Sequence, residues 1–318
     1  MNRADTMQAA VQRYLDERRR LGFSLKSPCT ELMRFARFAD ARDHQGPLTL
    51  DLQLDWAREH VARTSTVTAA RRLEVVRPFA TYYRQFEPAT EVPPPFILGR
   101  GHRRLAPHIY TDQEIGDLLA LSERMTPPGG LRPLTYKTLF GLIAATGLRI
   151  SEALNLQVKD IDLPMATLTV RQTKFNKSRC LALHTSVVQA LSDYLRARQR
   201  FIGCAGDTPV FASLSGRALS LRGVHNVFAG LRDQLGWRAR GEHALPRIHD
   251  LRHTMAVRRV QLWNEGGTSI EHAMFWLCTY LGHANISDTY WYLTGTPELM
   301  ESVCARFERF VQQGAGHE

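Results

Sequence analysis

The chain has 318 residues, which is long enough for two domains that each bury a core. Its hydrophobic fraction of 44% and charged fraction of 23% are ordinary for a globular protein, and they exclude a disordered or fibrous chain. The 41 Lys and Arg residues outnumber the 31 Asp and Glu residues, and the net charge of +10 favours a polyanionic partner, although a solvated basic surface has the same balance.

Apolar patterning argues against membrane association and secretion. No run approaches about 18 uninterrupted apolar residues, and the first residues have no apolar signal core. We therefore expect a cytoplasmic protein that does not associate with a membrane. The cysteines are odd in number and widely spaced, without the CxxC pairs of zinc or redox sites, so we expect free thiols in a reducing compartment. They are Cys29, Cys180, Cys204, Cys278 and Cys304.

Four segments with a helical spacing of apolar residues fill the first 88 positions. They are residues 9–21, 29–41, 50–62 and 64–86. The first ends at Gly22 after three arginines, whose charge suits the last turn of a helix. Pro78 lies within the fourth, so we expect that helix to break or kink there. This part of the chain is predicted to be an all-α module.

Residues 92–107 have the composition of a linker, with four prolines, two glycines and three arginines. We place a domain boundary in this segment and expect an N-terminal helical domain over residues 1–100 and a C-terminal domain over residues 101–318. Arg103 and Arg104 are candidates for DNA contacts because a basic linker can follow a phosphate backbone. A solvated linker would have the same composition.

The C-terminal domain begins with a capping box, formed by Thr111 and Glu114 at the start of a helix. A second helix over 134–146 ends at Gly147. Three β-like runs follow at 158–162, 166–172 and 179–184, the last two joined by the polar turn KFNK. Further helices are predicted at 185–200, 219–235, 247–263 and 268–281. The predicted fold class is mainly α, with a small antiparallel β-sheet in the C-terminal domain.

Four islands of the second domain carry polar groups that suggest chemistry. They read ATGLRISEALNLQVKDIDL (145–163), TKFNKSR (173–179), HDLRH (249–253) and LGHANISDTYWY (281–292). Each alone has an ordinary explanation, such as a surface arginine or a structural histidine. In order and spacing together they resemble the tyrosine recombinase (phage integrase) family over nearly all of residues 107–318. The N-terminal module resembles the core-binding domain of that family.

Finer features resemble one part of the family. The ending TYWYLTGTPELM and the long segment 264–281 look most like transposon-associated or recombinase-in-trio members. Two features depart from the common pattern: residues 181–184 read LALH where many relatives have a proline, and the stretch between Arg252 and His283 is longer than in compact members. Neither departure removes a reacting group.

Two arginines are the expected phosphate clamps. Phosphodiester transfer without a metal needs cationic donors on the nonbridging oxygens, because charge accumulates there in the transition state. Arginine suits this task because its planar fork stays charged and can bond two oxygens. The resemblance assigns the role to Arg149 and Arg252. It implies no metal and no nucleotide cofactor, and the chain has no GxxxxGK[ST] loop.

Three histidines accompany these arginines. His249 and Arg252 lie at i and i+3, so one helix can present both to the same phosphate. The resemblance implies that His249 donates to the phosphate or assists proton transfer, and that His283 is a further donor. His253 points elsewhere on the helix, and we interpret it as a packing residue.

The leaving 5′ oxygen needs a proton, which a lysine can supply when neighbouring arginines lower its pKa. Lys174 and Lys177 both lie in the turn between the last two β-like runs. The lysine of the family falls at the first position, so Lys174 is the predicted general acid. Lys177 and Arg179 are candidates for contacts with the DNA backbone. Lysine-rich turns are also a common surface feature.

Two tyrosines compete for the role of nucleophile. In a short helix over this stretch, Ile286, Tyr290 and Leu293 would form an apolar stripe that faces the core. Tyr292 lies about 200° from Tyr290 around the helix axis, so it would project from the other face. The nucleophile of the family follows the LGH histidine by nine residues, which is position 292 here. Tyr292 is therefore the predicted nucleophile, forming a 3′-phosphotyrosine bond with DNA.

The resemblance implies a site-specific DNA recombinase or integrase that acts on double-stranded DNA with specific recombination sites. Four copies would assemble on two sites, alone or with related recombinases. A nicking-closing enzyme similar to topoisomerase IB and a non-catalytic DNA-binding partner subunit remain as alternatives. A last amphipathic helix carries Leu299, Val303, Phe307 and Phe310, and it would pack on its own domain or on a neighbouring copy.

Overall fold

A computed structural model describes residues 6–23, 25–59, 65–101, 104–171, 178–268, 270–283 and 285–294. The chain divides into two compact units, Met1–Arg104 and Leu105–Glu318. Within the described ranges, none of the helices has the length and apolar character needed to cross a membrane. The fold is mainly helical, with one small antiparallel sheet in the second unit, as the sequence predicts.

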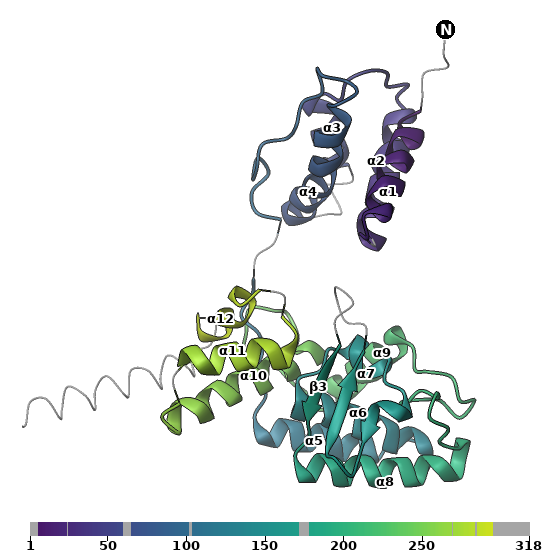
Figure 1. The fold of residues 1–318 in the computed structure, drawn as a ribbon, viewed down its shortest axis with the longest axis vertical. Coiled ribbons are helices and arrows are strands. Elements are labelled where there is room, and N and C mark those ends of the chain that lie inside the picture. The colour runs from purple at the N-terminus through teal and green to yellow at the C-terminus, as the bar shows by residue number, and fades with distance from the viewer. Residues whose placement is uncertain are drawn as a thin grey trace, which may run out of the picture. The chain divides into compact units, whose positions relative to one another are not determined.

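The first unit is built from helices (Figure 1). They are α1 (Met7–Arg20), α2 (Lys26–Asp40), α3 (Leu50–Arg58) and α4 (Thr66–Tyr83). Side-chain oxygens of Thr6 and Thr49 accept hydrogen bonds from the first turns of α1 and α3, as expected of N-cap residues. Their core contains the rings of Phe35 and Phe79, which meet edge to face. This part of the sequence therefore forms the predicted all-α module.

The sequence predicts a break or a kink at Pro78, and the break does not occur. Pro78 lies inside α4, which continues to Tyr83. Phe79 and Ala80, which follow the proline, are fully buried in the core of the unit. Burial of a large apolar side chain contributes about 1.5–3 kcal/mol, an amount comparable to the cost of about 3 kcal/mol for an internal proline. Tertiary packing thus opposes the local preference.

The second unit begins with α5 (Asp112–Glu123) and α6 (Leu131–Thr146), followed by the short α7 (Ile150–Leu154). The capping box of α5 is present, because the Glu114 nitrogen donates to Thr111 Oγ1 (3.1 Å) and the Thr111 nitrogen donates to Glu114 Oε2 (2.8 Å). After the sheet come α8 (Thr185–Ile202), α9 (Leu221–Gln234), α10 (Ile248–Glu265), α11 (Ile270–Leu281) and α12 (Ser287–Thr294).

The sheet has the order β1-β2-β3, with both neighbouring pairs antiparallel. Its strands are β1 (Ile161–Asp162), β2 (Thr167–Val170) and β3 (Arg179–Ala182). Val170 pairs with Arg179, so β3 begins beside the end of β2. The predicted strand over 158–162 is only partly correct, because Val158–Asp160 forms a 3-10 turn. The Asp160 carboxylate accepts from the Gln157 nitrogen (2.9 Å) and stabilises that turn.

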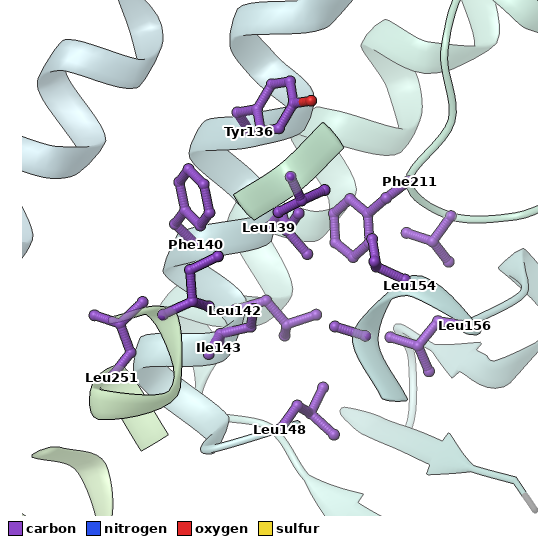
Figure 2. Packing of buried hydrophobic residues seen from close by; sticks show 14 of the residues in the cluster. Tyr136, Leu139, Phe140, Leu142, Ile143, Leu148, Leu154, Leu156, Phe211 and Leu251 are labelled. Carbon is purple, nitrogen blue, oxygen red and sulfur yellow. The ribbon is translucent and has the colours of Figure 1, made fainter. Parts of the chain in front are cut away.

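Helix α6 lies at the centre of the second unit. Figure 2 shows apolar side chains of α6, among them Leu139, Phe140 and Ile143, packed with residues from other elements. Leu148, Leu154 and Leu156 come from the chain after α6, and Leu251 comes from α10. Because α6 is buried on several faces, its C-terminal end is held firmly against α10. The polar groups described below begin at this end.

A smaller cluster joins α10, α11 and α12, which lie together in Figure 1. Its buried members are Met255, Ala256, Val257, Val260, Met274, Leu277 and Leu281, with Trp291 packed at the side. This cluster fixes the last turn of α11 against the first turns of α10. The two chain segments that carry the HDLRH and LGH motifs are therefore neighbours.

Candidate active site

Gly147 directs the chain from α6 into α7. It has φ of +64°, which favours glycine, and a Cβ atom at this position would lie 2.5 Å from Met255 Cε. Two residues later, Arg149 is the N-cap of α7, and its backbone nitrogen donates to Glu152 Oε2 (2.9 Å). Its Nη1 donates to Glu152 Oε1 (2.8 Å). The guanidinium of Arg149 is therefore held from within its own turn, with 30% of its side chain exposed.

Arg252 approaches the same region from α10. It is 1% exposed, and its guanidinium donates to the carbonyl oxygens of Gly147 (2.6 Å) and Leu281 (2.8 Å). Its Nη2 also lies 3.0 Å from His283 Nε2. These bonds join the end of α6 to the end of α11. Arg149 is the more accessible of the two guanidiniums.

Three successive carbonyl oxygens at the end of α11 accept from three different arginines. Tyr280 O accepts from Arg179 Nε (2.8 Å), and Leu281 O accepts from Arg252. Gly282 O accepts from Arg149 Nη2 (3.4 Å). The last carbonyls of a helix have no partner within the helix, and they form the negative end of its dipole. We call these three groups the α11 carbonyl turn, and it gathers Arg149, Arg179 and Arg252 at one place.

Glu152 lies between two of these arginines. Its carboxylate, in a side chain only 8% exposed, accepts from Arg149 and from both terminal nitrogens of Arg179, at 3.1 Å for Nη1 and 2.8 Å for Nη2. Burial acts to raise the pKa of Glu152, but hydrogen bonds and charge from Arg179 and Arg149 outweigh it and lower the pKa to about 2. Glu152 is therefore ionised at neutral pH.

His283 follows the α11 carbonyl turn directly. A guanidinium only donates, so His283 Nε2 accepts from Arg252 and the neutral ring carries its hydrogen on Nδ1. Nδ1 in turn lies 2.7 Å from the hydroxyl of Thr289, a fully buried residue of α12. Burial and the charge of Arg252 lower the pKa of His283 to about 4. In this structure the ring therefore links Arg252 to α12.

His249 and His253 form a ring contact on α10. Their centroids are 4.7 Å apart, and the ring of His253 also meets Trp291 of α12 edge to face at 5.2 Å. His249 is exposed at the surface, whereas His253 is buried, which agrees with the interpretation of His253 as a packing residue. Although part of the residue reaches the surface, burial of the rest of the side chain and the charge of Arg252 lower the pKa of His249.

The packing predicted for Tyr290 is wrong. Tyr290 and Ile286 are exposed, at 38% and 42%, so they do not form a stripe toward the core. Among the side chains of α12 that the structure describes, residues 287–291, the buried one is Thr289, which is held by its hydrogen bond with His283. Position 292 lies in α12, about 200° around the axis from position 290. The choice of Tyr292 as nucleophile no longer rests on the packing of Tyr290 and depends on its spacing from His283.

Several predicted site residues lie outside the described part of the chain. They are Lys174, Lys177 and Arg103, together with the predicted C-terminal helix over 298–313. Nothing in the structure describes the side chain of Tyr292 either. Arg104 is described and exposed. Arg179, predicted to contact DNA, has 11% of its side chain exposed and donates to protein acceptors with Nε, Nη1 and Nη2. Its contact with DNA stays a prediction.

Sequence reasoning missed Glu152 and Thr289, which connect the predicted residues. Glu152 follows Arg149 at i+3, a spacing that favours an ion pair in the first turn of a helix, so a signal for it was present. Thr289 gave no such signal, because its role depends on how α12 meets His283. Among the described residues, no group of three or more His, Cys, Asp and Glu side chains could hold a metal ion.

Replacing Gly282 with alanine should impair the site more than it impairs the fold. Gly282 has φ of +67°, and an added Cβ atom would lie 2.8 Å from Arg179 Nη1. The substitution should displace Arg179 and slow the DNA cleavage that the sequence resemblance implies by about tenfold or more, at a cost of about 1–3 kcal/mol in the free energy of unfolding. Urea unfolding and single-turnover cleavage would measure the two effects. Gly236→Ala is the matched control, since Gly236 has a similar φ of +64° and open space around it.

Mild acid should destabilise the second unit. The unfolded chain protonates its histidines below pH about 6.5, whereas folded His283 stays neutral down to about pH 4. The unfolded state then binds more protons, so the free energy of unfolding should fall as the pH falls from about 6.5 toward 4. The lowered pKa of Glu152 adds a further loss of stability as the pH falls through about 4.5, where the unfolded carboxyl takes up its proton, at the lower end of this range.

Urea midpoints measured at pH about 7 and about 4.5 would check this dependence. Tryptophan fluorescence reports mainly on the second unit, because four of the five tryptophans lie in it. A His283→Gln variant should show a weaker dependence, since glutamine does not titrate. Equal midpoints for the unsubstituted protein at the two pH values would contradict the prediction.

Comparisons with known proteins agree with this geometry. Residues 109–298 match the model described as the phage integrase family. The chain is 39% identical over 308 residues to a Sinorhizobium fredii protein named as integrase/recombinase y4rB, covering 96% of this chain and 98% of that one. It is 26% identical to the tyrosine recombinase XerC of Bacillus subtilis, covering 74% of this chain and 72% of that one.

Two solved structures share the fold. A Tn1549 transposon integrase in complex with a circular intermediate DNA has a TM-score of 0.67 at 20% identity, with 95% of this chain and 99% of that chain covered. The XerH site-specific recombinase bound to its difH substrate has a TM-score of 0.67 at 18% identity, with 95% and 85% covered. At these identities the likeness concerns the fold.

Proposed function

The chain belongs to the phage integrase family and is a site-specific DNA recombinase, and we propose that it cleaves and rejoins DNA at the arginine cluster through Tyr292. The single observation that carries this assignment is the α11 carbonyl turn, where neighbouring carbonyls hold Arg149 and Arg252. Two guanidiniums at one place can bond the nonbridging oxygens of one phosphate. We assign the acid, base and nucleophile to Lys174, His249 and Tyr292, whose motifs accompany Arg149 and Arg252 in the sequence.

The proposed step forms a bond between the phenolic oxygen of Tyr292 and the phosphorus, while the bond from phosphorus to the 5′ oxygen breaks. Lys174 supplies the proton that the leaving oxygen takes up. The lowered pKa of His249 keeps its ring neutral at pH 7, so it can accept the phenolic proton. The product is a 3′-phosphotyrosine, which conserves the phosphodiester for rejoining when a 5′ hydroxyl attacks.

The partner is double-stranded DNA with specific recombination sites. The solved relatives are described as complexes with transposon and recombination-site DNA, and this chain carries a net charge of +10. We infer that residues 1–100 are the core-binding domain, that residues 101–318 are the catalytic domain, and that Arg103, Arg104 and Lys177 contact the backbone. Four copies would synapse two sites, alone or with related recombinases, and the helix over 298–313 would join neighbouring copies.

The test uses a duplex site selected from a random pool by the protein itself and then nicked beside the cleavage point. Cleavage of such a suicide duplex releases a short strand that diffuses away, so the covalent intermediate accumulates. The proposal expects a protein–DNA adduct on a denaturing gel and recombinant products from two intact sites. Adduct without recombinants, together with relaxation of plasmid that lacks the site, would indicate a nicking-closing enzyme. Binding without any adduct would overturn the proposal.

A further inference from the structure

Arg179 is the first residue of β3, and its side chain turns into the protein. It is 11% exposed, its two terminal nitrogens bond both oxygens of Glu152, and its Nε donates to Tyr280 O at 2.8 Å. We propose that Arg179 is a positioning residue for recombination, which neutralises Glu152 and so leaves the charge of Arg149 available to the DNA phosphate. This inference rests on the proposed function of Arg149.

The charges around the α11 carbonyl turn support this role. Arg149, Arg179 and Arg252 bring three positive charges, and Glu152 brings one negative charge, which leaves a net charge of two. A phosphodiester carries one negative charge, and attack by a phenolate brings a second into the transition state. Without Arg179, the net charge would fall to one, and Glu152 would have Arg149 as its only ion-pair partner among the arginines of this cluster.

The geometry explains why loss of Arg179 would draw the side chain of Arg149 toward Glu152. Arg149 Nη1 and Arg179 Nη1 both donate to Glu152 Oε1, at 2.8 and 3.1 Å. Loss of Arg179 would remove two hydrogen bonds from the buried carboxylate of Glu152. Burial penalises the charged form of this carboxylate, so its unsatisfied acceptor sites would be costly. The side chain of Arg149 already donates to Oε1 and is the other arginine of the cluster bonded to Glu152. It would turn toward Glu152 and away from a phosphate.

A direct contact between Arg179 and DNA is the rival role. To make one, Arg179 would have to give up bonds to Glu152 and Tyr280 O inside the protein. The two roles predict different measurements. Loss of a phosphate contact weakens DNA binding and reduces the dependence of affinity on salt by about one unit of slope. Loss of a positioning residue slows cleavage of DNA that is already bound.

The decisive experiment measures adduct formation by Arg179→Met with the suicide duplex, under single turnover and at saturating protein. We expect a rate about 10- to 100-fold lower, which is less than the loss of a group that itself contacts the transition state. DNA affinity and its salt dependence should stay as in the unsubstituted protein. Arg179→Lys keeps the positive charge but loses the planar guanidinium. Its rate of adduct formation should fall between those of Arg179→Met and the unsubstituted protein.

A charge-compensating variant gives the sharpest outcome. Glu152→Gln in the Arg179→Met background removes the unbalanced negative charge and restores the net charge of two, so the rate should recover about tenfold. A DNA contact or a purely structural role would not be rescued in this way. Arg196→Met, which removes one exposed arginine of α8, is the matched control and should leave the rate unchanged.

These outcomes separate the inference from the proposed function. Absence of an adduct with the unsubstituted protein would overturn the proposed function. If that adduct forms, a double variant as slow as Arg179→Met would overturn the role of Arg179, and so would a loss of affinity with a reduced salt slope. If Arg179→Met fails to fold, the Arg179→Lys rate decides: a rate equal to that of the unsubstituted protein, with a reduced salt slope, would overturn the inference.

Discussion

Replacing Tyr292 with phenylalanine lowers the rate of covalent adduct formation with DNA by a factor on the order of 10⁴ or more, so that no adduct is detected. A loss of this size is typical of removing a nucleophile. Phenylalanine keeps the ring but lacks the oxygen that would form the bond to phosphorus. The substitution should leave DNA affinity and the urea midpoint close to those of the unsubstituted protein, because the two side chains differ by only one hydroxyl group. A suicide duplex and a denaturing gel measure the adduct.

Tyr290→Phe is the matched control for this experiment. Tyr290 lies two residues earlier on the same helix, and with 38% of the residue exposed its hydroxyl can be removed at little cost. It should form the adduct at the normal rate. The reverse pattern, in which Tyr290→Phe is inactive and Tyr292→Phe is active, would show that the nucleophile is Tyr290, which is exposed in the structure.

Replacing Arg252 with methionine should damage both the chemistry and the fold. Methionine keeps much of the side-chain volume but donates to none of the groups that Arg252 reaches. The buried carbonyls of Gly147 and Leu281 lose their donor, which costs about 1–3 kcal/mol each in the free energy of unfolding. Loss of a phosphate donor lowers the rate by about 10²- to 10³-fold. Urea unfolding and single-turnover cleavage measure the two losses separately.

Arg252→Lys separates charge from geometry. A single ammonium keeps the positive charge but cannot reach Gly147 O, Leu281 O and His283 together, as the planar guanidinium does. We therefore expect the cleavage rate of Arg252→Lys to remain well below that of the unsubstituted protein. Cleavage by Arg252→Met within tenfold of the unsubstituted protein, with the fold intact, would show that Arg252 is not a clamp on the phosphate.

Local signals in the sequence were sufficient for much of the fold. The capping box of Thr111 and Glu114 and the turn at Gly147 depend on neighbouring residues, and both are present as predicted. Pro78 does not break α4, because burial of Phe79 and Ala80 acts against a local preference. Interactions within a few residues are readable from sequence, whereas a competition between local and tertiary energies is not.

The candidate site follows the same division. The motifs locate Arg149, Arg252 and His283, and the structure brings these residues together. The inward direction of Arg179 depends on the register of β2 and β3 and on the position of α11. The apolar pattern of this helix predicts a buried Tyr290, whereas in the structure Thr289 is buried and bonds His283.

The anchors of the α11 carbonyl turn are main-chain oxygens, and this gives the arginine cluster an unusual tolerance to mutation. A point substitution can delete a carboxylate, but it cannot delete a peptide carbonyl. Substitution of the side chain of Phe275, which is exposed on α11, therefore removes no acceptor from the cluster. The helix can acquire new surface properties during evolution while the groups that hold the arginines persist, provided that the backbone keeps its path through Gly282.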